Sequence, residues 1–436
     1  MTERDLRPTG RITTAPTAPT APRRAGGRVR RGAAAVAAAL LLSATAAPAL
    51  AASPAAPRTA AWDARTAQHA RGALLSTTPL LDRTPAQLTE LLAANGVDAS
   101  AVRHGVTAHR LTYATVTPDG KPTTASALLV LPTGGGERLA TVSETHGTTA
   151  YRGYAPSTGE NFSALAALLY ASGGRAVVAP DYLGLGSGPG THPYVDTRSS
   201  VSASLDALRA ARAAAPRHGK RLTGEVYVTG FSQGGQVAMA LGRELARGAD
   251  PRFRLRALAP VAGPYDIEGV ELPALLDGRI DGPSAVFYLS YFLVAQNRLH
   301  PLYSDPREVF RAPYADRVEE LFDNDHRDEE IAEQLPGTPE ELLTDEWYER
   351  VRHPDGTFLE VIRLNDGVCT WAPRVPVRLH TSAGDRDVPA ANTRSCERDL
   401  AERGVRAEVV DHGDVDHFGA YVRAIAHNAR WFAGLG

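Results

Sequence analysis

The 436-residue sequence predicts an α/β fold in which helices cover both faces of a mostly parallel sheet. Two observations predict it. Between residues 106 and 265, short apolar segments rich in β-branched residues alternate with longer segments whose apolar residues recur at helical spacing. The same alternation returns over residues 373–436, after a stretch that lacks it. Strands that alternate with helices usually pair in parallel, because each helix forms the crossover between two strands.

Residues 1–51 are predicted to be a signal peptide. A basic segment at 23–31 precedes an apolar, Ala-rich run at 32–47, and Ala-Leu-Ala ending at Ala51 fits the small-x-small cleavage rule. We therefore expect cleavage near Ala51/Ala52 and a secreted protein. The alternatives are a retained anchor, for which the run is short, and a disordered tail. The export route, general secretory or twin-arginine, stays open.

Residues 52–105 are predicted to hold a linker followed by one helical segment. Thr84 and Gln87 form a capping box around Pro85, and a leucine stripe follows it. Gly96 is expected to end this helix.

Residues 106–265 form the first part of the predicted core. The first two strands flank Asp119-Gly120, a sequence typical of the turn in an antiparallel hairpin. Strands are expected at 109–117, 124–131, 139–144, 175–180, 225–230 and 256–262, and helices at 161–171, 197–215 and 233–247.

Residues 266–372 interrupt the alternation. They hold an aromatic, apolar helix candidate around 287–292 and an acidic stretch at 323–330, but no clear strand–helix pair. We expect this block to be a helical lid inserted between two strands; the alternative is an ordinary surface subdomain. The second part of the core, 373–436, is expected to contain strands at 375–381 and 406–411, a helix that ends near 403, and a final helix from 418.

The composition argues against several classes of function. The formal net charge is −2 and the basic excess lies in the signal peptide, so the rest of the chain lacks the basic face that nucleic acids require. The Gly-rich segment 181–188 fits neither a dinucleotide fingerprint nor a Walker loop. No Cys/His spacing resembles a zinc site, and the cluster of Asp and His at 411–417 lacks the central Gly of a calcium loop. We therefore expect no cofactor, no metal and no nucleic-acid partner.

The chain contains two cysteines, Cys369 and Cys396. In an exported protein such a pair is a candidate disulfide. The alternative is two buried free thiols.

The candidate nucleophile is Ser232, at the centre of Gly230-Phe231-Ser232-Gln233-Gly234. This Gly-x-Ser-x-Gly motif requires a strand before it and a helix after it, and the sequence predicts both. The glycines are needed because the turn is strained and crowded. The helix N-terminus beneath Ser232 favours the negative charge that develops in acyl transfer.

A serine hydroxyl needs a base to take its proton, and the base needs an acid to orient it. In this order of motifs the acid follows a later strand and the histidine follows the next one. Asp385 comes first after the strand at 375–381, and Asp387 is the second choice. His417 is favoured as the base over His412, because it directly precedes an amphipathic helix.

The oxyanion hole should consist of two backbone N–H groups. One should come from Gln233, the residue after the nucleophile. The other should come from the loop 145–149, where Gly147 permits close approach and the N–H of Thr148 is the expected donor. His146 in the same loop is interpreted as a structural anchor.

These motifs resemble those of the α/β-hydrolase superfamily and, more narrowly, of secreted bacterial hydrolases similar to the yeast secretory lipases. The resemblance spans roughly residues 106–434 and is carried by His146-Gly147-Thr148-Thr149, Asp181-Tyr182-x-Gly184-Leu185-Gly186, the serine motif with Gly235, Asp385 before Val388-Pro389, and His417 before Phe418-Gly419. It implies an eight-stranded sheet, no cofactor, a helical lid, and hydrolysis of esters through an acyl-enzyme. The His-Gly-Thr segment departs from the His-Gly-Gly-Gly of the hormone-sensitive-lipase relatives.

The sequence therefore predicts a secreted, monomeric serine hydrolase that cleaves carboxylic esters, with a small-molecule or lipid ester as substrate and transient contact of the lid with a lipid surface. Two alternatives stay open: a peptidase or amidase with the same Ser–Asp–His triad, and a catalytically idle binding protein. Acyl transfer to an alcohol other than water is a further variant.

Overall fold

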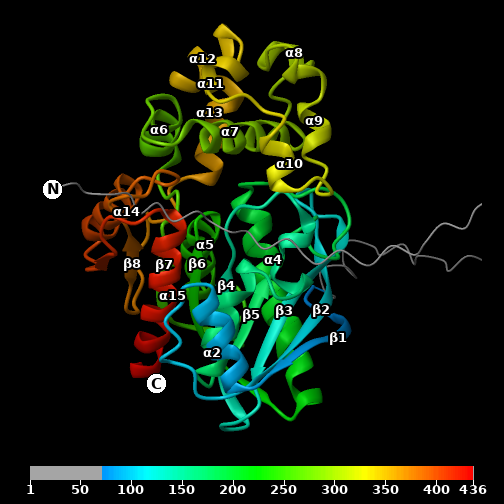
Figure 1. Ribbon diagram of the computed structural model, residues 1–436, viewed down its shortest axis with the longest axis vertical. Coiled ribbons are helices and arrows are strands. Elements are labelled where there is room, and N and C mark those ends of the chain that lie inside the picture. Colours follow the sequence, from blue (N-terminus) through cyan, green and yellow to red (C-terminus); the bar gives the residue numbers. More distant parts are fainter. Residues whose placement is uncertain (1–70, 436) are drawn as a thin grey trace, which may run out of the picture. The chain divides into compact units, whose positions relative to one another are not determined.

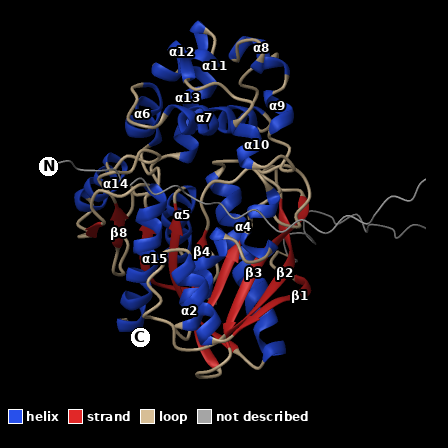
Figure 2. Cartoon of the chain, in the orientation of Figure 1, coloured by secondary structure: helices blue, strands red, loops and turns tan. Residues whose placement is uncertain are grey.

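The computed structural model describes residues 71–435, so the predicted signal peptide lies outside the described residues. A nine-stranded sheet runs through this part of the chain in the order β1-β2-β3-β5-β4-β6-β7-β8-β9 (Figures 1 and 2). The strands are β1 (Leu74–Arg83), β2 (Val106–Val116), β3 (Pro122–Pro132), β4 (Arg138–Thr145), β5 (Ala176–Pro180), β6 (Arg221–Phe231), β7 (Arg254–Val261), β8 (Arg378–Thr381) and β9 (Glu408–Asp411).

The sheet has one antiparallel end and one parallel end. Strands β1 to β3 pair antiparallel, β3 pairs antiparallel with β5, and every pairing from β5 to β9 is parallel. The expected hairpin joins β2 to β3, with Val116 opposite Pro122. The predicted mostly parallel α/β fold is thus confirmed.

The ninth strand corrects the expected count of eight. Strand β1 falls within 52–105, where only a linker and a helix are expected. Its sequence, Leu-Leu-Ser-Thr-Thr-Pro-Leu-Leu-Asp-Arg, does not alternate, and its pairing with β2 is irregular on both sides of Pro79. Proline is tolerated there because β1 is the edge strand of the sheet. The expected helix follows as α2 (Pro85–Ala94), with the capping box of Thr84 and Gln87 formed.

Helices cover both faces of the sheet. On one face, α2, α3 (Leu165–Ser172) and α15 (His417–Gly434) bury apolar side chains against one set of strand residues. On the other face, α4 (Thr197–Ala214), α5 (Gln233–Ala246) and α14 (Ala391–Glu402) pack against the alternate set. In β6, for example, Tyr227 points to the first face while Val226 and Val228 point to the second, as the two-residue period of a strand requires.

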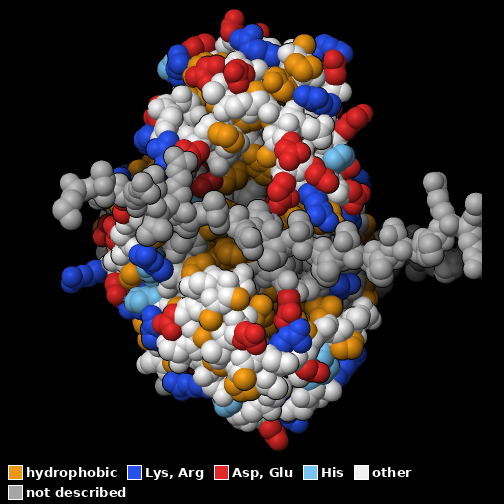
Figure 3. Space-filling view, in the orientation of Figure 1, with side chains coloured by type: hydrophobic (Ala, Val, Ile, Leu, Met, Phe, Trp, Pro, Cys, Tyr) orange, Lys and Arg blue, Asp and Glu red, His pale blue; other side chains and the backbone are white. Residues whose placement is uncertain are grey.

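Between β7 and β8 the chain forms a layer of helices with a hydrophobic cluster of its own. Figure 1 shows these helices beyond one end of the sheet, and Figure 3 shows hydrophobic side chains between them and the α/β layers. We call residues 266–372 the lid block. Its helices are α6 (Leu272–Leu276), α7 (Gly282–Asn297), α8 (Pro306–Val309), α9 (Val318–Leu321), α10 (Asp328–Ala332), α11 (Pro339–Leu342), α12 (Asp345–Arg352) and α13 (Gly356–Asn365).

The expected disulfide is present. Cys369, just after α13, is bonded to Cys396 in α14, and both residues are buried in the core. The bond therefore ties the end of the lid block to the α/β layers. Across the described residues, no helix combines the length and apolar character needed to cross a bilayer.

Candidate active site

Ser232 sits at a sharp turn between β6 and α5. Its backbone φ is +55°, a conformation that costs free energy in any residue except glycine. The flanking glycines allow the turn, because a Cβ on either Gly230 or Gly234 would come within 2.0 Å of Thr145 atoms. The N–H of Ser232 donates to the carbonyl of Val261 at 2.9 Å, which fixes the turn to the next strand.

Asp385 lies in the turn after β8 and holds His417, the first residue of α15. The Nδ1 of His417 is 2.7 Å from Oδ2 of Asp385, and both side chains are buried. The other carboxylate oxygen, Oδ1, accepts the N–H groups of Asp387 and Val388 at 2.9 and 2.8 Å. A carboxylate held in this way makes Nδ1 the protonated nitrogen of the ring, so Nε2 is left as the proton acceptor. That Nε2 is buried and has no hydrogen-bond partner among residues 71–435.

The second choices from the sequence have other partners. Asp387 accepts a hydrogen bond from the hydroxyl of Tyr288 at 2.8 Å. His412 is paired with His380, whose Nδ1 lies 2.9 Å from Nε2 of His412. Neither is hydrogen-bonded to His417 in the described part of the chain.

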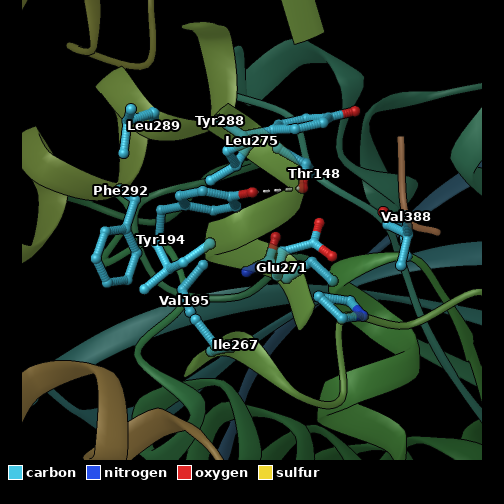
Figure 4. Close-up of a pocket in the computed structure, with 14 residues that line it drawn as sticks. Thr148, Tyr194, Val195, Ile267, Glu271, Leu275, Tyr288, Leu289, Phe292 and Val388 are labelled. Carbon is cyan, nitrogen blue, oxygen red and sulfur yellow. Dashed lines mark hydrogen bonds between the residues drawn. The ribbon is translucent and has the colours of Figure 1, made fainter. Parts of the chain in front are cut away.

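Two cavities meet at Ser232. The first, which we call the lid-side cavity, runs under the lid block and is shown in Figure 4. The second, the histidine-side cavity, contains His417. Both are lined by Ser232, Thr148 and Tyr288. The lid-side cavity is otherwise lined mainly by apolar residues: Val195, Pro264, Ile267, Leu272, Leu275, Leu289, Phe292 and Val388.

Thr148 and Gln233 lie next to Ser232 from two directions. Thr148 borders both cavities, and a Cβ on the preceding Gly147 would lie 3.3 Å from the Cβ of Ser232, so this loop approaches the serine closely. Gln233 is the first residue of α5, whose first N–H groups have no partner within the helix. The backbone N–H groups of Thr148 and Gln233 have no backbone partner among the described residues.

His146 is held within the structure, as interpreted from the sequence. Its Nδ1 is 2.7 Å from the carbonyl oxygen of Gly147 and its Nε2 is 3.3 Å from that of Asp181. Burial lowers the pKa of His146, which favours the neutral ring, and a neutral ring donates to only one of these two carbonyl oxygens.

Comparison with known proteins concerns the fold that carries this arrangement. No family model matches the chain, and no curated protein matches it. Solved structures do match. The rice cell wall degrading esterase LipA from Xanthomonas oryzae is 29% identical, with a TM-score of 0.70 over 83% of this chain and 95% of the esterase. A proposed hydrolase from Legionella pneumophila is 26% identical, with a TM-score of 0.76 over 83% of this chain and 98% of that protein.

The chain has the α/β-hydrolase fold. Lipase A of Candida antarctica, 14% identical with a TM-score of 0.58 over 80% of this chain and 78% of the lipase, agrees with this assignment at the level of the fold. Resemblance to an esterase at 29% identity supports hydrolase activity in this α/β-hydrolase.

Sequence reasoning missed several side chains that line the cavities of this α/β-hydrolase. The Tyr194 hydroxyl is hydrogen-bonded to the Thr148 hydroxyl at 3.0 Å. Tyr288, in α7, lines both cavities. Glu271 is a carboxyl group in the apolar wall of the lid-side cavity. The aromatic pattern around 287–292 indicated a lid helix but not which of its faces lines a cavity, and no local motif distinguishes Tyr194 or Glu271.

Proposed function

We propose that this α/β-hydrolase is a secreted serine esterase that cleaves carboxylic esters through an acyl-enzyme. The observation that carries the proposal is the strained Ser232, which shares a cavity with the unpartnered Nε2 of His417, while Asp385 holds the opposite ring nitrogen. The likeness to an esterase supports the choice of an ester bond.

In this proposal Ser232 Oγ attacks the ester carbonyl carbon and gives its proton to Nε2 of His417. The carbonyl oxygen becomes an oxyanion that accepts hydrogen bonds from the N–H groups of Gln233 and Thr148. His417 then returns the proton to the leaving alkoxide, the C–O bond breaks, and the acyl-enzyme remains. Water repeats the two steps and releases the acid, and Asp385 stabilises the charged imidazole each time.

In this proposal each of the two cavities takes one half of the ester. His417 must reach the leaving oxygen to protonate it, and His417 lines the histidine-side cavity. The alcohol half therefore occupies that cavity, and the acyl half occupies the lid-side cavity, whose lining is largely apolar. The lid block would supply this acyl pocket and contact a lipid surface when the substrate is a lipid ester.

The experiment is hydrolysis of p-nitrophenyl esters with C2 to C16 acyl chains by the mature protein, with Ser232→Ala beside it. We expect activity that Ser232→Ala abolishes and that the exposed control Ser100→Ala leaves unchanged. Full activity in Ser232→Ala would overturn the proposal. Faster turnover of matched amides than of esters would move the enzyme to the amidase alternative.

A further inference from the structure

Glu271 is the carboxyl group in the wall of the lid-side cavity. It ends the short helical turn Ile267–Glu271, directly before α6, and Figure 4 shows it among the cavity-lining side chains. The other residues of that turn and of α6 that line the cavity, Ile267, Leu272 and Leu275, are apolar. A carboxyl group in such a wall is costly unless it has hydrogen-bond partners.

The structure supplies a partner for only one of its oxygens. Asn392, fully buried in α14, donates its Nδ2 to Oε2 of Glu271 at 2.6 Å. The amide of Asn392 is oriented for this role, because its Oδ1 accepts the N–H of Asp266 at 3.1 Å. The second oxygen, Oε1, has no hydrogen-bond partner among residues 71–435. The Glu271 side chain is half-buried and lines the lid-side cavity.

The other polar side chains of the lid-side cavity, besides the nucleophile Ser232, use their hydroxyl or nitrogen atoms in hydrogen bonds. The hydroxyls of Thr148 and Tyr194 bond to each other, and the Tyr288 hydroxyl donates to Asp387. The side-chain nitrogen of Gln233 is 3.3 Å from His192. The Oε1 of Gln233 also lacks a partner, but it is buried. Apart from the Ser232 hydroxyl, Oε1 of Glu271 is thus the unpaired side-chain oxygen that a ligand in this cavity can engage.

We propose that Glu271 is a specificity-determining residue that selects esters whose acyl group carries a hydroxyl. The assignment rests on the proposed function, because it places the acyl half in the lid-side cavity. A substrate hydroxyl completes the hydrogen bonding of Oε1, whereas a plain alkyl chain covers this oxygen and leaves it unpaired.

The chemistry of the carboxyl group favours a hydroxyl over other substituents. Burial raises the pKa of Glu271 to about 8, so near neutral pH the acid is largely protonated and Oε1 carries a proton to donate. Above that pH Oε1 accepts instead. A hydroxyl can serve both forms, because it donates as well as accepts. Sites with a buried polar group reject ligands that lack the matching group far more strongly than apolar sites reject small changes of size.

The test compares p-nitrophenyl hexanoate with its 2-hydroxy, 3-hydroxy and 6-hydroxy derivatives, and measures kcat/KM for each. We expect the wild type to prefer at least one hydroxylated ester by about tenfold or more. Glu271→Leu should abolish that preference through faster turnover of the plain ester and slower turnover of the hydroxylated one. Glu271→Gln should keep most of the preference, because its amide can still accept from Asn392 and donate into the cavity.

Glu268→Leu is the matched control, because Glu268 lies on the same helical turn but pairs with Arg363 outside the cavity. It should leave unchanged the ratio of kcat/KM for the preferred hydroxylated ester to kcat/KM for the plain hexanoate. A wild type that hydrolyses the plain and all the hydroxylated esters equally well would overturn the assignment, even if Glu271→Leu fails to fold. A wild type that hydrolyses none of these esters would instead count against the proposed function.

Discussion

At the scale of single residues, the proposal depends on which carboxylate orients His417. Asp385 is bonded to His417, while Asp387, two residues later, accepts from Tyr288 of the lid block. The same turn thus gives two aspartates different surroundings. The Asp385 side chain is directed to His417, and the Asp387 side chain to Tyr288 of the lid block.

We predict that Asp385→Asn lowers kcat by about 10³- to 10⁴-fold, because an amide can present its N–H to the ring and favour the wrong tautomer of His417. KM should change little. The measurement is ester hydrolysis at saturating substrate, with Asp387→Asn as the control, since its amide oxygen can still accept from Tyr288. A larger loss in Asp387→Asn than in Asp385→Asn would transfer the orienting role to Asp387.

Residue roles could be predicted where a motif and its place in the chain agree. The serine motif lies between a strand and a helix, and the candidates Asp385 and His417 each follow a strand. This local context was enough to select, from the sequence, residues that lie close together in the structure. Glu271 and Tyr194 could not be predicted, because they come from segments distant in the chain and meet only where the lid block folds over the sheet.

At the scale of elements, the lid block is fastened to the core by polar contacts. Asp328 in α10 accepts the N–H groups of Ala150 and Tyr151 at 2.8 and 2.9 Å through one carboxylate oxygen. On the other side, Asp281, just before α7, pairs with Arg386 at 2.6 Å. These contacts hold the lid block beside the loops that carry Thr148 and Asp385.

We predict that Asp328→Ala loosens the lid block, because it leaves two N–H groups without an acceptor, at a cost of about 1–3 kcal/mol if they stay buried. Hydrogen exchange in α10 and in the loop at 148–151 should speed up. The matched control is Asp316→Ala, which removes an exposed ion pair with Arg307 elsewhere in the lid block and should have little effect. Unchanged exchange in Asp328→Ala would show that apolar packing alone holds the block.

The secondary structure was predictable where periodicity was strong and failed where proline interrupts it. Helices α4 and α5 begin at the expected residues 197 and 233. Strand β8 starts at Arg378 instead of residue 375, because Pro376 has no N–H to donate to the ladder. The irregular edge strand β1 was missed for a related reason, since Pro79 interrupts its sequence pattern and the pairing register shifts directly after it.

At the scale of the whole molecule, a group of histidines joins the elements that carry Asp385 and His417. His380 of β8 is buried, with Nε2 2.7 Å from Oδ1 of Asn428 in α15 and Nδ1 2.9 Å from His412 after β9. Asn428 uses its nitrogen to donate to Ala259, so its oxygen accepts from His380. With both rings neutral, Nδ1 of His380 therefore accepts from Nε2 of His412. A second proton on His380 would require His412 to shift its own proton to Nδ1.

We predict that acid weakens the fold through this group. Burial lowers the pKa of His380 well below its usual value and that of His412 to about 4, so the folded state keeps both rings neutral. The unfolded chain takes up protons as the pH falls below about 6.5, so the free energy of unfolding should be intact above that pH and fall progressively towards pH 4.

Urea unfolding at pH 7 and pH 5 measures this loss. His412→Gln, which can still donate to His380, should lose less stability on acidification than the wild type. His353→Gln, at an exposed histidine, should behave like the wild type. An equal loss in all three proteins would assign the acid sensitivity to other groups.

Covalent labelling is the most direct test of whether Ser232 is an activated nucleophile. The mature protein is treated with a fluorophosphonate probe, and the site of modification is found by mass spectrometry of its peptides. We expect a single stoichiometric adduct on Ser232, which is lost in Ser232→Ala and forms much more slowly in His417→Ala. A folded protein that remains unlabelled, or an adduct on a different serine, would contradict it.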